Sequence, residues 1–334
     1  MTRGMILEKI QKDLTNRGIT NRQLADLLGI SHSKVNQSIS GKREFDFSVY
    51  AEILNMLYTN DYSFRKTEVF NYCNQAKRKV NLRIAFEYVD MCGELELLNH
   101  LINREKQSNN LLNRKFASAY ELLYLRNAEE FNPREFLKLV KGEMGKQKNA
   151  EDISKIPMEF ALIYAFFDSR SYNLVSANID ELKTEIEKVK NPFLKSSYEL
   201  RTMELLATCF HRNNELERAR ELCDDMISKN GRVSLLPKAT AYCIMGETYI
   251  LTDYELSKYY LDKGLSLVAS PSNQKMRKKQ QMLQTTIDFL NIHFEKNLDH
   301  IHPINPTERG YLYMPINLRL FTTPKYKKTL FFLT

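Results

Sequence analysis

The sequence predicts an all-α protein, in which an N-terminal helix-turn-helix domain is followed by a degenerate α-solenoid of helical repeats. Apolar residues recur at spacings of three and four through most of the 334 residues. Glycine and proline, with 11 and 9 residues, are sparse. No segment alternates apolar and polar residues as a half-buried strand does. The predicted parts are residues 1–60, residues 61–298 and a divergent tail, residues 299–334.

The first predicted element is a short helix that starts near residue 21 and ends in a tight turn. Leu24, Leu27 and Leu28 recur at positions i, i+3 and i+4, which gives this helix an apolar face. Gly29 follows where a helix ends with a positive φ, a conformation that glycine adopts without a Cβ clash. The sequence therefore predicts a helix that stops at this glycine.

A second short helix follows the turn. Ser31 is a good N-cap, and Val35 and Ile39 form the apolar stripe of the helix it starts. A small residue at Ala25, a glycine four positions later and a β-branched residue six positions after that are typical of a helix-turn-helix. The second helix is then the one expected to enter the major groove of DNA.

The polar residues of this second helix and of the turn after it are the candidate DNA contacts. Asparagine and glutamine can bond an adenine edge, whereas lysine and arginine suit phosphate oxygens. Residues 1–80 hold 13 Lys and Arg against 8 Asp and Glu, which favours an anionic partner. A solvated face in a protein-interaction module is the alternative, and His32 is also typical of a plain surface position. The candidates are His32, Ser33, Lys34, Asn36, Gln37, Lys42 and Arg43.

The long middle, residues 61–298, contains two segments that resemble each other. They are MELLATCFHRNNELERARELC and YCIMGETYILTDYELSKYYL. In both, bulky residues precede a small residue and an aromatic one, and a further small residue opens the partner helix. Small residues let the two helices of a hairpin approach, as in tetratricopeptide (TPR) repeats. The middle is therefore predicted to be a TPR-like solenoid whose concave face binds extended peptides or partner helices.

Several function classes lack their signatures. The chain contains no GxxxxGK[ST], GxGxxG, HExxH or GxSxG motif, so we expect neither an enzyme nor a nucleotide cofactor. The six histidines have no metal-ligand spacing, so no metal site is expected. Five scattered cysteines indicate buried free thiols in a reducing cytoplasm. No apolar run reaches the roughly 18 residues of a membrane span, and the charged N-terminus is unlike a signal peptide.

The two repeat segments, extended to SYELRTMELLATCFHRNNELERAREL and ATAYCIMGETYILTDYELSKYYLDKGLSL, resemble the arbitrium receptor family. These are the lysis–lysogeny pheromone receptors of temperate Bacillus phages, within the peptide-binding quorum-sensing regulators. The stretch IDFLN at residues 287–291 is similar as well. The resemblance covers residues 45–298 and is spread over many weak positions.

The resemblance implies a mechanism. A peptide-free receptor would bind a double-stranded DNA operator as a homodimer and activate transcription that promotes lysis. A peptide of about six residues would bind the repeat groove and silence that activation. A phage-type repressor whose helical domain only oligomerises, and a TPR protein-interaction adaptor without DNA, are the competing hypotheses.

The resemblance also carries over some peptide-binding positions. Thr208 and Glu247 stand where the family usually has asparagine, so Glu247 favours a peptide with a basic side chain or is a surface carboxylate. Arg201 is the expected partner of the peptide carboxylate or backbone; the alternative is a surface pair with Glu199 or Glu204. The candidate peptide contacts are Arg201, Thr208, Arg212, Tyr242 and Glu247.

The tail departs from the family. Residues 299–334 contain four prolines and no helical period, as a truncated, frame-shifted or divergent end would. A solenoid needs a terminal repeat with a polar outer face. We therefore expect under-packed helices around residues 282–294, poor dimerisation and a weak response to peptide.

Overall fold

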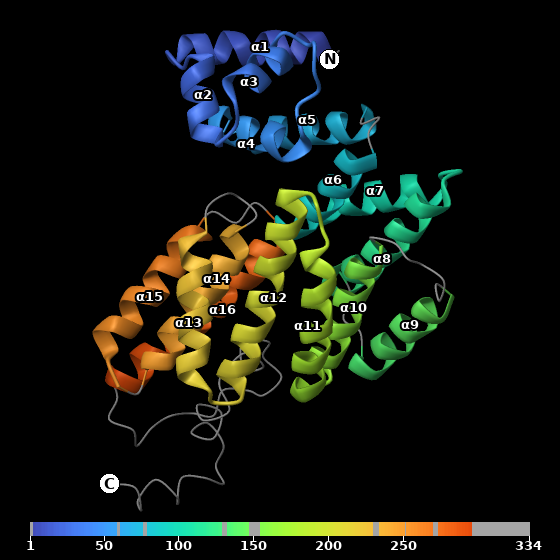
Figure 1. Ribbon diagram of the computed structural model, residues 1–334. Helices are drawn as coiled ribbons and strands as arrows, with labels where there is room; N and C mark the ends of the chain where they lie inside the picture. Colours follow the sequence, from blue (N-terminus) through green and yellow to red (C-terminus); the bar gives the residue numbers. More distant parts are fainter. Residues whose placement is uncertain are drawn as a thin grey trace, which may run out of the picture. The chain divides into compact units, whose positions relative to one another are not determined.

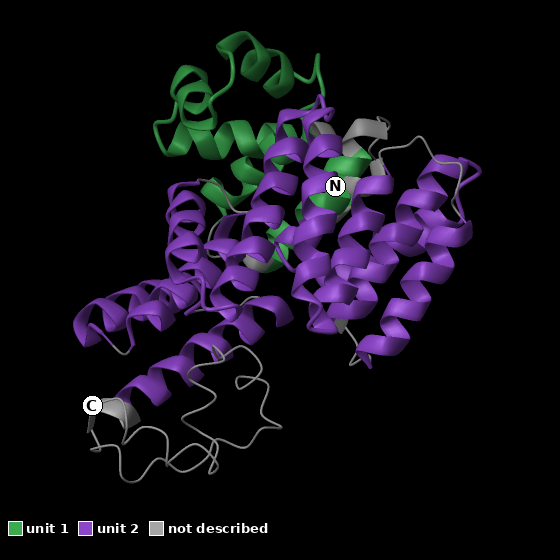
Figure 2. Ribbon diagram, turned by 60° about the horizontal axis from the view of Figure 1, so that its bottom comes forward, with its two compact units in different colours: residues 1–88 green, residues 89–334 purple. Residues whose placement is uncertain are grey.

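The structure is a computed structural model that describes residues 3–58, 61–75, 79–128, 132–146, 154–229, 234–250, 252–269 and 273–295. Within these ranges the chain forms sixteen α-helices and no strand (Figure 1). The all-α prediction is confirmed. The chain divides into two compact units, residues 1–88 and residues 89–334 (Figure 2).

Unit 1 contains a small helical bundle around one apolar core. Its buried side chains include Ile10, Leu24, Val35, Phe47 and Leu54. The last helix of the unit, α6, continues into unit 2. The helices are α1 (Arg3–Asn16), α2 (Asn21–Leu28), α3 (His32–Ile39), α4 (Phe47–Leu57), α5 (Tyr62–Gln75) and α6 (Lys79–Met91).

Helices α2 and α3 form the predicted helix-turn-helix. Gly29 ends α2 with φ 63°, in the left-handed region. Ser31 caps α3, because its hydroxyl accepts a hydrogen bond from the Lys34 main-chain N–H. The predicted stripe of α3, Val35 and Ile39, is buried. Local sequence signals thus determine where α2 ends and where α3 begins.

The prediction that Leu27 belongs to the apolar face of α2 is wrong. Its side chain is 66% exposed, whereas Leu24 and Ala25 are buried. Successive residues of an α-helix are rotated by about 100°. Leu28 therefore falls between Leu24 and Ala25 on the helix circumference, and Leu27 falls outside that arc. A two-turn helix buries only this narrow arc against α3.

Unit 1 extends to residue 88, beyond the predicted domain boundary at residue 60. The reason is aromatic packing between α4 and the helices after it. The ring of Phe47 lies 5.2 Å from that of Tyr72 and 5.3 Å from that of Tyr88, both edge-on. Tyr50 stacks on Tyr72 at 4.9 Å. Helix α5 and the first part of α6 therefore complete the core of unit 1.

Unit 2 is a two-layered α-solenoid. Helices α8, α10, α12, α14 and α16 form one layer, called the inner layer below, and α9, α11, α13 and α15, which alternate with them in sequence and pack against them, form the outer layer (Figure 1). The helices are α7 (Leu95–Lys106), α8 (Leu111–Ala128), α9 (Pro133–Lys146), α10 (Lys155–Asp168), α11 (Tyr172–Glu187), α12 (Pro192–Arg212), α13 (Leu216–Ser228), α14 (Leu235–Tyr249), α15 (Tyr254–Leu267) and α16 (Gln274–Glu295).

Small residues let paired helices of the solenoid approach, as the repeat pattern predicts. A Cβ atom on Gly246 of α14 would lie 2.5 Å from Leu261 Cγ of α15. The Ser257 hydroxyl of α15 donates a hydrogen bond to the Gly246 carbonyl at 2.8 Å. In the preceding hairpin, Ala207 and Ala219 are fully buried. These residues set the close spacing within each hairpin.

The expectation of an under-packed α16 is wrong for the side chains that the structure describes. Leu283 and Leu290 are fully buried, and Ile287 is 8% exposed. The apolar face of α16 packs on α14 and α15 within one cluster, so α16 itself covers the last hairpin. The tail, residues 299–334, lies outside the described residues.

Four cysteines are buried free thiols, as predicted, and the side chain of Cys73 lies outside the described residues. They are Cys92, Cys209, Cys223 and Cys243. Among the described helices, none has the length and apolar character needed to span a membrane.

Candidate functional site

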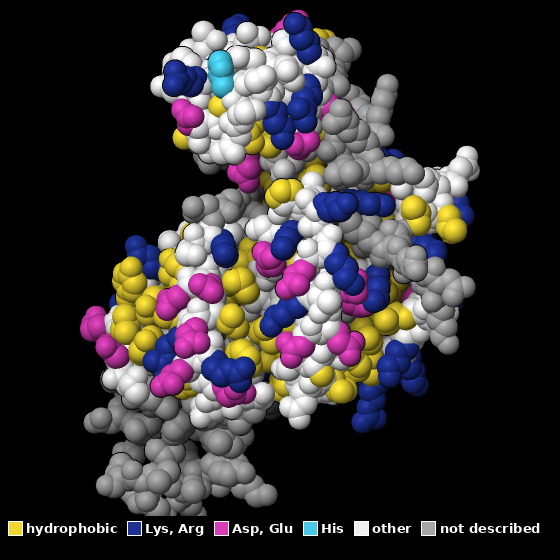
Figure 3. All heavy atoms as spheres, viewed as in Figure 1, with side chains coloured by type: hydrophobic (Ala, Val, Ile, Leu, Met, Phe, Trp, Pro, Cys, Tyr) yellow, Lys and Arg dark blue, Asp and Glu magenta, His cyan; other side chains and the backbone are white. Residues whose placement is uncertain are grey.

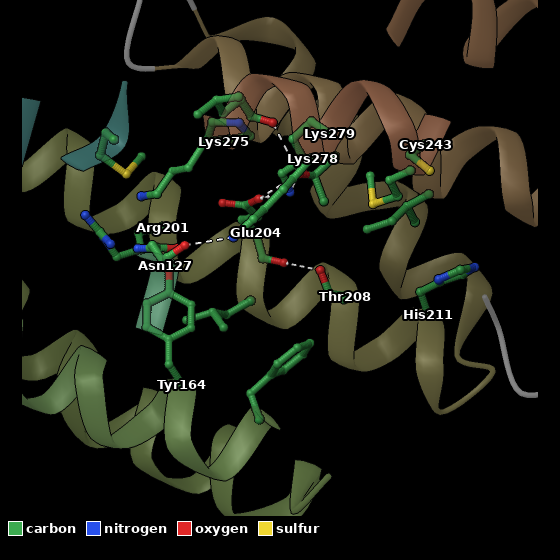
Figure 4. A pocket seen from close by; sticks show the side chains of 18 of the residues that line it. Asn127, Tyr164, Arg201, Glu204, Thr208, His211, Cys243, Lys275, Lys278 and Lys279 are labelled. Carbon is green, nitrogen blue, oxygen red and sulfur yellow. Dashed lines mark hydrogen bonds and ion pairs between the residues drawn. The ribbon is translucent and has the colours of Figure 1, made fainter. Parts of the chain in front are cut away.

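A cavity of about 180 Å³ opens on the inner layer of unit 2 (Figure 4). Helices α8, α10, α12, α14 and α16 each contribute to its wall, together with Met91 at the end of α6. Charged and polar side chains share the wall with apolar ones. The residues around it are Met91, Arg126, Asn127, Tyr164, Phe167, Arg201, Glu204, Leu205, Thr208, His211, Leu236, Pro237, Thr240, Cys243, Ile244, Glu247, Lys275, Lys278, Lys279 and Met282.

Helical periodicity explains how each helix presents these side chains. On α12 the contributing residues run from Arg201 to His211 at steps of three, one, three and three, so they lie along one face. On α16 they run from Lys275 to Met282 at steps of three, one and three. Ten residues along α12 correspond to about 15 Å at 1.5 Å per residue. A span of about 15 Å fits four or five residues of an extended peptide.

The first charged group at the cavity is centred on Asp90, near the end of α6. Its fully buried carboxylate accepts hydrogen bonds from Arg201 Nη2 and Lys275 Nζ, each at 2.8 Å. Burial by itself would raise the pKa of Asp90, but the two cations outweigh burial and lower it to about 2. Lys275 Nζ also donates to the Asp90 carbonyl at 2.7 Å. The carboxylate is therefore ionised and firmly held.

A second charged group joins three inner helices. Glu204 of α12 accepts hydrogen bonds from Thr240 of α14 at 2.6 Å and from Lys279 of α16 at 2.9 Å. Burial opposes ionisation of Glu204, yet Lys279 and Thr240 together lower its pKa. Glu204 lies in the middle of the view in Figure 4. The side chains of Glu204, Thr240 and Lys279 line the cavity and link α12, α14 and α16 there.

The other side of the cavity contains a buried polar pair, His211 and Glu247, in which the imidazole is uncharged. His211 Nε2 lies 3.5 Å from Glu247 Oε2, and both side chains are at least 97% buried. Burial, with Arg212 next to it, lowers the pKa of His211 to about 3, so the imidazole is neutral at neutral pH. Glu247 Oε1 accepts a hydrogen bond from Thr286 at 3.1 Å. This contact is therefore not an ion pair, and Glu247 is the acidic residue on this side of the cavity.

Three of the five predicted peptide contacts lie at the cavity: Arg201, Thr208 and Glu247. The alternative of a surface pair between Arg201 and Glu199 or Glu204 is wrong, since Arg201 is 2% exposed and bonded to Asp90. The alternative of Glu247 as a surface carboxylate is also wrong, because it is 7% exposed.

The other two predicted contacts do not contribute to the cavity wall. Arg212 donates to the Tyr172 hydroxyl at 3.2 Å and stacks over the Phe167 ring. Tyr242 lies beside Tyr260 of α15, with ring centroids 6.3 Å apart. Both side chains point between helices of the solenoid.

Sequence reasoning missed the basic face of α16. Lys275, Lys278 and Lys279 follow an i, i+3, i+4 spacing that places them together on one face. That periodicity was available in the sequence. Asp90 had no such signal, because its partners Arg201 and Lys275 are 111 and 185 residues away.

The candidate DNA contacts lie on α3 and on the turn after it. His32, Ser33 and Gln37 are exposed, as are Lys42 and Arg43. Basic side chains and a histidine are visible on the face of unit 1 in Figure 3. Exposed donors and acceptors on a capped helix can reach base edges and phosphates.

Two candidates already have partners within the module. The Asn36 amide oxygen accepts a hydrogen bond from Asn21 Nδ2 at 2.7 Å, and its Nδ2 lies 3.2 Å from His32 Nε2. Lys34 is half-buried and forms an ion pair with Asp46. Asn36 is therefore held in one orientation, and Lys34 is less available to phosphate than Lys42.

No group of three or more potential metal-ligating side chains occurs among the described residues.

Comparison with known proteins identifies one family. The model of the family described as AimR transcriptional regulator-like matches residues 66–317. The AimR transcriptional regulator of Bacillus phage SPbeta is 20% identical over 284 residues, which are 84% of this chain and 70% of the relative. An uncharacterized protein of Bacillus anthracis is 22% identical over 151 residues, 44% of this chain; that match spans only 56% of the relative's length.

Solved structures with the same fold include two of phAimR. SeMet-phAimR superposes with a TM-score of 0.69 at 20% identity, over 97% of this chain and 81% of that one. A phAimR–ligand structure gives a TM-score of 0.61 at 21% identity, over 81% and 75% of the two chains. At these identities the likeness establishes the fold.

Proposed function

Because the chain belongs to the AimR transcriptional regulator-like family, we propose that it is a transcriptional regulator that binds an operator through α3 and a short peptide in the cavity of unit 2. The cavity is the observation that carries this proposal. Its charged groups are held in place by Asp90 and Glu204, so they are preorganised for a ligand. A peptide needs such fixed donors and acceptors for its backbone and its end groups.

The DNA-binding part of the proposal rests on unit 1. Asn36 and Gln37 would read base edges, with His32 and Ser33 beside them, and Lys42 and Arg43 would contact phosphates. One helix-turn-helix covers a single half-site, so a homodimer would be needed for a full operator. The chain would act in the cytoplasm of a bacterial host.

The regulatory part follows the arbitrium receptors that the sequence resembles. A peptide of about six residues would bind Thr208, Glu247 and their neighbours at the cavity and silence operator-dependent activation. In a phage, loss of that activation would favour lysogeny over lysis. The role is regulatory, without a catalytic step or a cofactor.

A DNA-binding experiment tests the first half of the proposal. Genomic fragments retained by the full chain identify the operator, and fluorescence anisotropy then measures affinity. Asn36→Ala should weaken operator binding by about 1–3 kcal/mol and leave binding to random DNA unchanged. Lys42→Ala should weaken both and reduce the slope of log affinity against log salt by about one. Absence of salt-dependent DNA binding would favour the adaptor hypothesis instead.

A peptide titration tests the second half. Synthetic peptides encoded beside the gene are added to the protein–operator complex, and the change in anisotropy is recorded. Glu247→Gln should reduce the peptide response at least tenfold, because it replaces a buried carboxyl oxygen at the cavity with an amide group while keeping the shape of the side chain. The matched control is Glu217→Gln, an exposed position on the outer helix α13. Operator binding that no peptide changes would favour the repressor whose helical domain only oligomerises.

A further inference from the structure

The basic face of α16 contains one cation whose charge is not balanced by a carboxylate. Lys275 is paired with Asp90, and Lys279 is paired with Glu204. Lys278 Nζ instead donates to the main-chain carbonyl of Asn127 at 2.7 Å. Among the described residues no carboxylate oxygen lies within ion-pair distance of it. An ammonium group has three donors, so two remain for another acceptor.

The surroundings of Lys278 are positive. Burial lowers its pKa first, and the nearby cations Arg126 and Lys275 lower it further. The charge of Arg126 is shared with Asp168, which it binds through two hydrogen bonds of 2.7 and 2.9 Å. A positive side chain near other cations in a partly dehydrated cavity favours a bound anion.

The position of this cation within the cavity limits what the anion can be. Lys278 Nζ lies at the carbonyl of Asn127, and Lys275 and Asn127 lie to the left in Figure 4, whereas His211 and Cys243 lie to the right. The wall also contains apolar side chains, among them Leu205, Leu236 and Met282. An anion bound at one end of the cavity would fit the end group of a short peptide, whose neighbouring residues are then apolar or uncharged.

We propose that Lys278, beside Lys275, forms an anion subsite that binds the free C-terminal carboxylate of the regulatory peptide. This inference rests on the proposed peptide-binding function and specifies the direction in which the peptide lies. The carboxylate would receive charge-assisted hydrogen bonds from Lys278, which are stronger than those between neutral groups. The rest of the peptide would extend along α12 toward Thr208 and His211.

The test uses two synthetic hexapeptide libraries, randomised at every position, one with free carboxyl termini and one with C-terminal amides. Each is incubated with the full chain, and peptides retained on size exclusion are quantified by mass spectrometry. We expect the free acids to be retained about tenfold or more over the amides, as the loss of a hydrogen bond to a charged group implies.

Two variants of Lys278 and one control locate the effect. Lys278→Met should bring the acid-to-amide ratio close to one. Lys278→Gln removes the charge but keeps a donor for the Asn127 carbonyl, and it should also bring the ratio close to one. It replaces Lys278→Met in the test if that variant folds poorly. Arg277→Met removes one positive charge from an exposed position of the same helix and should keep the wild-type ratio.

The outcomes separate this inference from the proposed function. Equal retention of acids and amides by the wild type, or an unchanged ratio in both Lys278 variants, would overturn the subsite while peptide binding stands. Enrichment of acidic side chains in both libraries would overturn the assignment to the C-terminus. If neither library is retained, the peptide-binding proposal fails together with the subsite.

Discussion

Replacing Asp90 with asparagine tests how much the buried ion group of the cavity stabilises unit 2. The pKa of Asp90 is about 2 in the folded chain against 3.8 for an unperturbed carboxyl group. A shift of nearly two units corresponds to about 2.5 kcal/mol of folding free energy at neutral pH. Removing one partner of a buried pair costs about 3–5 kcal/mol. Because asparagine keeps one acceptor oxygen for Arg201 or Lys275, we expect Asp90→Asn to lose about 2–4 kcal/mol.

Urea unfolding of the full chain, followed by far-ultraviolet circular dichroism, measures this loss. The matched control is Asp180→Asn on α11, whose carboxylate is 76% exposed beside Lys183. It should change the free energy of unfolding by less than about 0.5 kcal/mol. The folded pKa of Asp90 is lowered, so its contribution is complete above pH 3.8 and is lost as the pH falls toward 2. The difference in free energy of unfolding between wild type and Asp90→Asn should therefore be constant near neutral pH and shrink below about pH 3.8.

A midpoint for Asp90→Asn that equals that of Asp180→Asn, with the same denaturant slope, would refute this reasoning. It would mean that the desolvation cost of three buried charges cancels their attraction.

Three further predictions concern other parts of the chain. The pKa of His211 falls from 6.5 to about 3 on folding, so between these pH values the imidazole binds a proton only in the unfolded chain. The free energy of unfolding should therefore drop by up to about 1.4 kcal/mol per pH unit on acidification in this range. His211→Gln should reduce this pH dependence, as measured by urea unfolding at several pH values. Gly246→Ala should lower the free energy of unfolding by about 1–3 kcal/mol in the same assay, because its Cβ would overlap Leu261. The control Gly142→Ala, which has open space around it, should stabilise the protein slightly. Equal effects of the two substitutions would contradict the close packing of α14 on α15. Ser31→Ala removes the N-cap of α3 and should cost about 1 kcal/mol, with Ser31→Asp restoring most of it, as measured by thermal melting.

The sequence alone was sufficient for the helix-turn-helix and for the solenoid class. Gly29 acts through its left-handed backbone and its bonds to carbonyls of the preceding turn, and Ser31 acts through a bond to the main-chain N–H three residues later, so both effects are visible in a local stretch. The small residue at Gly246 is equally local, because helical spacing determines which face it lies on. Leu27 is the exception in this region: spacing placed it on the apolar face, and only the contact with α3 decided which arc of α2 is buried.

The cavity was decided by tertiary structure. Arg201, Thr208 and Glu247 could be proposed from the repeat pattern, but their partners could not. Asp90 and Lys275 are 185 residues apart, and nothing in the sequence near either one marks the other. Periodicity tells which face of a helix a residue occupies; it does not tell which distant helix faces it, because that depends on how successive hairpins stack. The same stacking leaves Lys278 opposite a main-chain carbonyl and not a carboxylate, and so decides where the proposed anion subsite lies.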